Sequence, residues 1–169
     1  MKTSWMIFTV LILFTTTSCG YYSTSGRTAG DIKKIAVPYF KNETTEPDIE
    51  IEITQKIIDG LIKDNTLKVV SEDEADAILE GTVIEYKNVP FTFSQTTGEI
   101  QAEQYRLVIS LNISLYNKKK NEYVWENRKV TVHGDYYLES SVEQNYEKAL
   151  ETVYNDIVEN ILNATVQEW

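Results

Sequence analysis

The feature that most constrains the fold is a strict alternation of side chains between residues 105 and 116. Apolar side chains occupy every second position, and polar ones fill most positions between them. A period of two is typical of a β-strand, because successive side chains point to opposite faces of the sheet. This strand therefore covers a core on one side only. The apolar positions are Tyr105, Leu107, Ile109, Leu111, Ile113 and Leu115.

Two amphipathic helices provide the apolar surface that such a sheet needs. The first is predicted to start at Thr45 as N-cap, with Pro47 in its first turn, and to stop at Asn65. The second is predicted to open at Ser140, which has capping-box spacing to Glu143. Both carry apolar residues at intervals of three and four, so each has one face suited to lying on a sheet.

The remaining segments are β-prone. They are residues 32–40, 67–70, 77–89 and 122–138. Pro38 places the first at a sheet edge or ends its pairing, and Pro90 is expected to end the third. The apolar parity of the last changes between Trp125 and Val130, which predicts a bulge after the turn at residues 117–121.

Residues 91–104 are predicted to form a loop. Its Phe91 and Phe93 either pack as core or contact acyl chains or a partner. The element order β-α-β-β-β-β-α predicts an α+β domain. We expect two amphipathic helices packed on one face of a mostly antiparallel sheet of four to five strands.

The first residues have the organisation of a secretory signal. Lys2 precedes an apolar run of ten residues, 5–14, which is half the length of a membrane span. Small residues follow, and then Cys19, which is similar to the start of a bacterial lipoprotein. We predict a signal peptide at residues 1–18, a lipidated Cys19 opening a Gly/Ser/Thr-rich tether at 19–30, and one domain at 31–169. The alternative is a buried free thiol in a secreted protein.

The charge pattern argues against nucleic acid as a partner. The chain carries 16 basic and 26 acidic residues, a net charge of −10, whereas phosphate backbones need a basic footprint. Residues 104–137 reverse this balance, with six basic and three acidic side chains. This region is either a solvated turn with scattered charges or a site for an anionic ligand. The candidate anion-binding residues are Arg106, Lys118, Lys119, Lys120 and Arg128.

The residues required for common catalytic or metal sites are scarce. The chain has one His and one Cys, so an internal disulfide is excluded and a zinc site of the usual ligand types is disfavoured. It has no phosphate-binding loop and no nucleophile elbow. We interpret His133 as structural and predict a protein that is not an enzyme and has no metal or other cofactor.

Several short segments together resemble a known family. They are CGYY at 19–22, IAVPYFKNET at 35–44, LKVVS at 67–71, ADAILEGT at 75–82, the strand at 105–116 and VWE at 124–126. This order is similar to that of the LptE lipopolysaccharide-assembly lipoproteins over roughly residues 19–165. The resemblance implies two helices against a four-stranded sheet. It also implies a lipid-anchored protein, acylated with chains such as palmitate, on the periplasmic side of the outer membrane.

The resemblance further implies how such a protein acts. LptE-like proteins plug the lumen of the large LptD-type β-barrel, support its assembly and bind lipopolysaccharide. The five basic residues above are the lipopolysaccharide-binding candidates, chosen by charge alone. Two alternatives remain open. One is another small α+β lipoprotein that activates a peptidoglycan synthase or builds a secretion pore. The other is a hydrolase that uses strand carboxylates such as Glu80 and Glu126.

Overall fold

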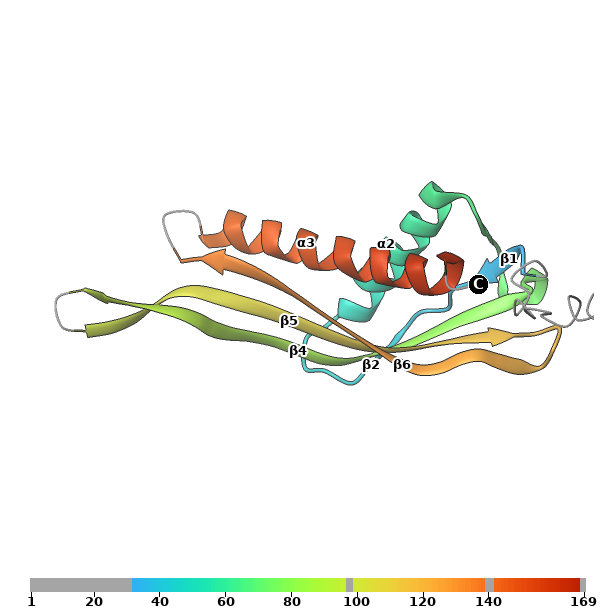
Figure 1. Cartoon of the computed structure of the whole chain (residues 1–169), viewed down its shortest axis with the longest axis horizontal. Helices are drawn as coiled ribbons and strands as arrows, with labels where there is room; N and C mark the ends of the chain where they lie inside the picture. The colour runs from blue at the N-terminus through green and yellow to red at the C-terminus, as the bar shows by residue number, and fades with distance from the viewer. Residues whose placement is uncertain (1–31, 97–98, 139–141, 168–169) are drawn as a thin grey trace, which may run out of the picture.

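Three long strands dominate the fold. The computed structural model describes residues 32–96, 99–138 and 142–167. Strands β4 (Ala77–Thr96), β5 (Glu99–Asn117) and β6 (Glu122–Tyr137) form an antiparallel meander (Figure 1). Ala77 pairs with Asn117 at one end, and Thr96 pairs with Glu99 at the other. At about 3.3 Å per residue, the 20 residues of β4 make a sheet about 65 Å long.

Three short strands complete the sheet beside β4. Strand β1 (Lys34–Ala36) lies between β3 (Lys68–Val69) and β4 and runs parallel to both. Strand β2 (Lys41–Asn42) pairs with β4 at Thr82 and Val83, also in parallel. The predicted α+β fold with a mostly antiparallel sheet is confirmed, although the sheet has six strands among the described residues rather than four or five.

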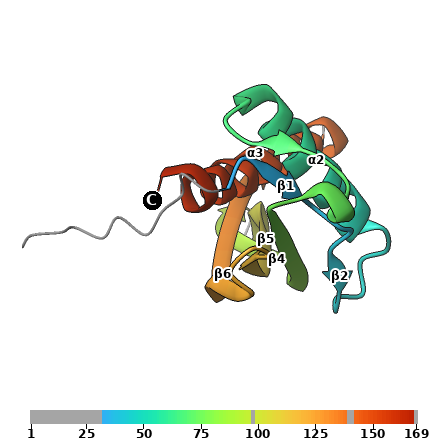
Figure 2. The same cartoon turned by 90° about the vertical axis from the view of Figure 1, so that its right-hand side faces the viewer.

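Both helices cover the same face of this sheet. Helix α2 (Ile49–Asp64) and helix α3 (Val142–Leu162) lie on one side of the three long strands (Figures 1 and 2). Their apolar stripes meet the alternate apolar positions of β5, which are fully buried. This burial is the main source of stability expected for such a domain. The buried stripe residues are Ile53, Ile57 and Leu61 on α2 and Val153, Ile157 and Ile161 on α3.

The start of α2 differs from the prediction. The helix begins at Ile49, and its N-cap is Asp48 in the left-handed conformation (φ 61°) rather than Thr45. Asn42 explains the difference, because its amide accepts from the Thr44 N–H and donates to the Glu46 carbonyl, which holds this segment in a turn. The predicted stop is confirmed, with Asn65 as a left-handed C-cap. The predicted cap at Ser140 lies outside the described residues.

The predicted loop at residues 91–104 is wrong. Strand β4 continues through Pro90 to Thr96, and β5 begins at Glu99, so this segment is a long hairpin. Pro90 is tolerated because among the described residues β4 has no neighbour on its outer side beyond Val83. The missing N–H of proline therefore costs no ladder hydrogen bond with a second strand. We call residues 89–96 and 99–104 the distal ribbon.

The predicted bulge in β6 is confirmed. The pairing with β5 shifts between Ile113 and Leu115, which pair with Arg128 and Trp125. Asn127 lies in the shift with a left-handed φ of 51°, and its N–H donates to the Ser114 hydroxyl at 3.0 Å. The bulge turns Trp125 back toward the core side, where it packs beside the buried cluster.

Beside β1, η2 (Glu72–Glu74) is a short 3₁₀ turn, and the chain after α3 continues as a π-turn, η3 (Asn163–Gln167). The start of β1, η2, the β5–β6 turn and η3 all lie at the same end of the sheet, opposite the distal ribbon (Figure 1). The sheet therefore has two distant ends, one formed by these turns and the start of β1 and the other by the distal ribbon.

Candidate functional site

One carboxylate organises the end of the sheet where β1 begins. The Asp76 side chain accepts hydrogen bonds from the backbone N–H groups of Lys33 and Lys34, each at 2.9 Å. Its other oxygen forms an ion pair with the Lys119 ammonium at 2.9 Å. The Lys119 bond and the two backbone donors lower the pKa of Asp76 to about 2. Asp76 thus joins the start of the chain's first strand to the β5–β6 turn.

The same residue fixes the turn through its backbone. The Lys118 N–H donates to the Asp76 carbonyl at 2.9 Å, and the Lys118 ammonium donates to the Glu72 carbonyl. The Lys120 N–H donates to the Asn117 side chain at 3.1 Å. These hydrogen bonds fix the backbone of the turn, and the side chains of Lys118, Lys119 and Lys120 are all exposed.

The structure adds three lysines to this turn that the sequence analysis missed. Lys33 and Lys34 follow from the bonds to Asp76, and Lys68 pairs with Lys34 across β1 and β3. We call the six residues the basic end: Lys33, Lys34, Lys68, Lys118, Lys119 and Lys120. Five carboxylates lie at the same end, on residues 72–74, Asp76 and Glu122, so its net charge is 6 − 5 = +1. The signal that could have found Lys34 and Lys68 is that each lies near the start of a short β-prone run.

Arg106 lies far from the basic end. Its guanidinium forms a bidentate pair with Asp135 at 2.6 and 2.7 Å and stacks 3.4 Å from the centre of the Phe91 ring. Arg106 lowers the pKa of Asp135, chiefly through these hydrogen bonds. Eleven residues of β5 separate Arg106 from Asn117, about 36 Å. The carboxylate of Asp135 therefore compensates the charge of Arg106.

Arg128 occupies a third place. It pairs with Ile113 beside the β6 bulge and is half-buried. The five basic residues selected from the sequence therefore do not form one cluster. The structure brings residues 118–120 together and leaves Arg106 and Arg128 elsewhere on the sheet.

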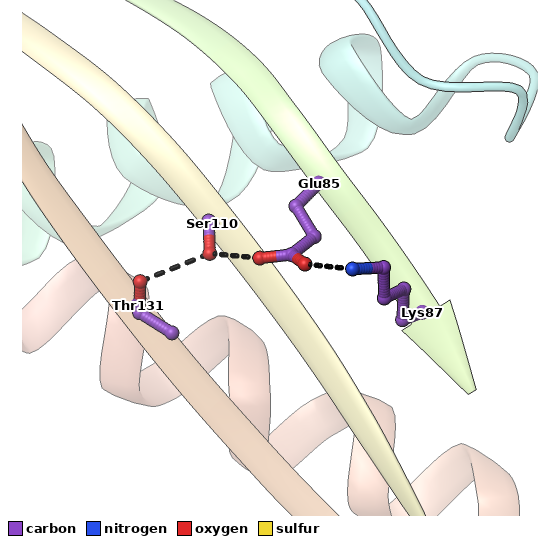
Figure 3. Close-up of polar contacts among 4 residues, drawn as sticks. All are labelled: Glu85, Lys87, Ser110 and Thr131. Carbon is purple, nitrogen blue, oxygen red and sulfur yellow. Dashed lines mark hydrogen bonds and ion pairs between the residues drawn. The ribbon is translucent and has the colours of Figure 1, made fainter. Parts of the chain in front are cut away.

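The face of the sheet opposite the helices is polar and ordered. Glu85 on β4 accepts a hydrogen bond from Ser110 on β5 at 2.8 Å and pairs with Lys87 at 2.5 Å (Figure 3). Ser110 also bonds to Thr131 on β6 at 2.9 Å, so the chain of contacts crosses all three long strands. The Lys87 contact, followed by the Ser110 bond, lowers the pKa of Glu85. We call this surface the open face.

The open face also has a concavity next to β2. Its volume is about 460 Å³, and short side chains on β4 and β5 form its floor between two tyrosines. Three carboxylates, on Glu43, Glu80 and Glu126, line the hollow against the single ammonium of Lys41, so its lining has a net negative charge. Its lining includes Tyr39, Lys41, Glu80, Thr82, Asn112 and Tyr123.

The distal ribbon presents aromatic side chains to solvent. Phe91 is 44% exposed and Phe93 is 60% exposed, so neither packs as core in the described structure. Val89, Leu138 and Val142 near the same end are also more than a third exposed. The interpretation of Phe91 and Phe93 as contact residues for a partner or acyl chains is the one that their exposure allows.

The described residues show neither a metal site nor a spanning helix. No group of three or more His, Cys, Asp or Glu side chains in the described part of the chain is arranged to hold a metal ion. Among the same residues, no helix has the length and hydrophobicity needed to cross a bilayer.

A comparison with models of protein families identifies the family to which this fold belongs. The model of the LptE lipopolysaccharide-assembly family matches residues 32–165, which include both helices and all six strands. The chain belongs to the LptE family. Members of the LptE family act in lipopolysaccharide assembly and are not enzymes, so the alternative of a hydrolase loses its support. A comparison with curated proteins finds no match.

Solved structures share the LptE-type fold at low sequence identity. Protein XCC0632 from Xanthomonas campestris is 13% identical with a TM-score of 0.57, covering 83% of this chain and 91% of that chain. Uncharacterized lipoprotein B from Nitrosomonas europaea is 14% identical with a TM-score of 0.55, covering 78% and 80%. A minor lipoprotein from Acinetobacter baumannii is 12% identical with a TM-score of 0.52, covering 80% and 94%. At these identities the similarity shows the fold alone.

Asp76 offers a test of the basic end. Because the folded pKa of Asp76 lies below its ordinary value of 3.8, its contribution to stability is complete above pH 4 and is lost as the pH falls toward 2. Asp76→Asn should lower the free energy of unfolding by about 1–2 kcal/mol at pH 6 and by much less near pH 2. Urea denaturation at the two pH values measures both differences. Asp73→Asn, in the adjacent turn, is the matched control, and an equal loss at both pH values would contradict the assignment.

Proposed function

We propose that this LptE-family chain is a lipid-anchored protein on the periplasmic side of the outer membrane. In this proposal it plugs and helps fold an LptD-type β-barrel and binds lipopolysaccharide during delivery to the outer leaflet. The family match across residues 32–165 carries the proposal, because it spans nearly the whole described fold rather than one motif. The function is binding and scaffolding, with no covalent chemistry.

The proposed anchor is Cys19. Signal-peptide cleavage after residue 18 would leave Cys19 as an acylated N-terminus, followed by a tether to residue 30. Two or three acyl chains hold a protein at a membrane stably, since each buried methylene contributes roughly 0.8 kcal/mol. The domain that follows begins at the basic end, because Ile32 directly precedes Lys33 and is only 4% exposed.

The open face supports the barrel part of the proposal. The interiors of large outer-membrane barrels are polar, and a plug that fills one needs a matching polar surface. The open face offers such a surface, with the Glu85, Ser110 and Thr131 contacts holding its side chains in place (Figure 3). The helices on the other face complete a core that is independent of the partner.

The direct test is purification with the membrane partner. The full chain, tagged at its C-terminus, is extracted from outer membranes in mild detergent, and the proteins that accompany it are identified. A large β-barrel protein in near-equal amount is the expected result. A peptidoglycan synthase, or a ring made only of this chain, would instead favour the alternative small lipoproteins. Depletion of the chain should also reduce surface lipopolysaccharide and folded barrel.

The basic residues give a prediction about the ligand. Replacing Lys118, Lys119 and Lys120 by Gln should weaken lipopolysaccharide binding by the full chain about tenfold or more, since each lysine near an anionic lipid surface contributes about 1 kcal/mol. Wild-type binding should fall with added salt. Surface plasmon resonance with immobilised lipopolysaccharide measures the change.

The same measurement distinguishes the candidate residues. Arg106→Gln and Arg128→Gln, tested separately, ask whether the two arginines outside the basic end contribute. Lys56→Gln, on α2, is the control for loss of one positive charge. Unchanged affinity in the triple lysine variant would leave the β5–β6 turn with a purely structural role.

A further inference from the structure

The most unusual feature of the basic end is a pair of lysines placed directly opposite each other. Lys34 on β1 and Lys68 on β3 are in register, so their side chains leave the same face of two strands that lie about 4.8 Å apart. Both side chains are exposed. Within the described residues, neither ammonium forms an ion pair. Like charges directly opposite in a sheet are destabilising, so this arrangement suits an anion placed between them.

The position of the pair indicates where that anion comes from. Lys34 lies two residues after Ile32, where the described chain begins at the basic end. Cys19 is 13 residues before Ile32, and 13 residues span at most about 45 Å. The tip of the distal ribbon lies about 60 Å further along β4. A lipid on Cys19 therefore keeps the lysine pair within about 45–50 Å of a membrane surface, whereas it leaves the distance of the ribbon tip less restricted.

Aromatic side chains near the basic end fit the same environment. Tyr116 and Tyr123 meet edge to face with ring centres 5.3 Å apart, close to the β5–β6 turn. Tyr123 is 43% exposed. Tyrosine is suited to a membrane interface, where its ring meets acyl carbons and its hydroxyl meets water.

We propose that the basic end docks on anionic phospholipid headgroups of the leaflet that holds the Cys19 lipid, with a headgroup phosphate between Lys34 and Lys68. The inference rests on the lipidation of Cys19 in the proposed function. Membrane anchoring by acyl chains is commonly reinforced by a basic patch. The net charge of the basic end is only +1, so the contact depends on the local lysine pair rather than on long-range attraction. Docking fixes the direction in which the long sheet leaves the membrane.

The test measures the reactivity of each lysine on vesicles. The full lipidated chain, with the Cys19 modification checked by mass spectrometry, is placed in vesicles of phosphatidylcholine, of phosphatidylcholine with phosphatidylglycerol, and of phosphatidylcholine with lipopolysaccharide. Brief amine acylation then reports the accessibility of each lysine. Docking predicts that labelling of Lys34 and Lys68 slows about fivefold or more on phosphatidylglycerol vesicles, and that high salt removes the effect.

The chain supplies its own controls. Lys56 on α2 and Lys148 on α3 lie away from the basic end and should label equally on all three vesicles. Equal labelling of Lys34 and Lys68 on neutral and phosphatidylglycerol vesicles would overturn the inference. Protection by lipopolysaccharide vesicles alone would also overturn it and would assign the lysine pair to the lipopolysaccharide site.

A double variant separates docking from folding. Docking should also slow the labelling of the neighbouring Lys33 in the wild-type chain on phosphatidylglycerol vesicles. Lys34→Gln/Lys68→Gln removes the repulsion, so the variant should unfold at an equal or higher urea concentration while Lys33 loses this protection. Lys56→Gln/Lys63→Gln is the matched control and should keep that protection. The vesicle experiment contains no barrel protein. Its result therefore does not depend on whether the chain co-purifies with a barrel. Should Cys19 carry no lipid, the anchor in the proposed function fails, and sedimentation of the unlipidated chain with the same vesicles decides the docking.

Discussion

Gly134→Val should prevent α3 from docking on the sheet. A Cβ at Gly134 would lie 2.5 Å from the Ala149 carbonyl oxygen and 3.0 Å from a Val153 methyl group. The first neighbour is helix backbone, which cannot move aside as a side-chain end can. Valine needs still more room than a single Cβ. We expect a loss of about 3 kcal/mol or more, a large part of the stability of an ordinary domain.

The neighbouring position provides the control for this prediction. His133 lies on the same strand with its side chain exposed on the open face, so His133→Val adds the same residue without touching α3. Urea denaturation followed by far-UV circular dichroism compares the two variants. Gly134→Ala should fall between wild type and Gly134→Val. Equal stability of the two valine variants would show that α3 does not pack against Gly134 as described.

Cys19→Ala should remove the lipid that anchors the protein to the outer membrane. In the proposed function Cys19 is the acyl attachment point, and no helix in the described part of the chain is suited to span a bilayer. Without acyl chains, stable attachment loses a contribution of about 0.8 kcal/mol for every methylene that would have been buried. We expect complete loss of palmitate labelling and a smaller outer-membrane fraction, in which the remaining protein is held by the barrel.

Gly20→Ala is the control for this variant, because it keeps the cysteine and changes only the next residue. Radiolabelled palmitate incorporation and separation of inner and outer membranes measure both expectations. Palmitate labelling that persists in Cys19→Ala would contradict the anchor at Cys19. Absence of palmitate from the wild-type protein would favour the alternative of a free thiol in a secreted protein.

The alternation in β5 was the most informative pattern in the sequence. Leu107, Ile109 and Leu111 are fully buried beneath the helices, while Ser114 and Arg106 lie on the other face, so one strand predicts both the core and the open face. The parity change around Trp125 likewise predicts the bulge. The structure confirms both patterns because burial on one side determines the register of a long strand.

The distal ribbon shows where such patterns fail. Pro90 and Gly98 are both typical of strand ends, yet β4 continues past Pro90 because it lies on an edge there. Whether a strand is an edge depends on which strands pair with it, and pairing is not visible in one sequence. The same reason hides the parallel placement of β1 between β3 and β4.

The basic end was only half visible for a related reason. Lys118, Lys119 and Lys120 are consecutive and could be found, whereas Lys34 and Lys68 are 34 residues apart and meet only through strand pairing. Asp76 lies in an acidic stretch of the sequence, residues 72–76. Its bonds to Lys33, Lys34 and Lys119 depend on tertiary structure and could not be read from spacing.

The length of the β4–β5 hairpin has a mechanical consequence for the proposed complex. The sheet is about 65 Å long, whereas the apolar band of an outer-membrane barrel is only about 25 Å tall. A rod of this length aligned with the barrel axis has about 40 Å outside the band. If the basic end is held near the periplasmic surface, one part of the sheet lies inside the apolar band of the barrel and the rest lies outside it. Phe91 and Phe93 then lie at the end of the sheet farthest from that surface.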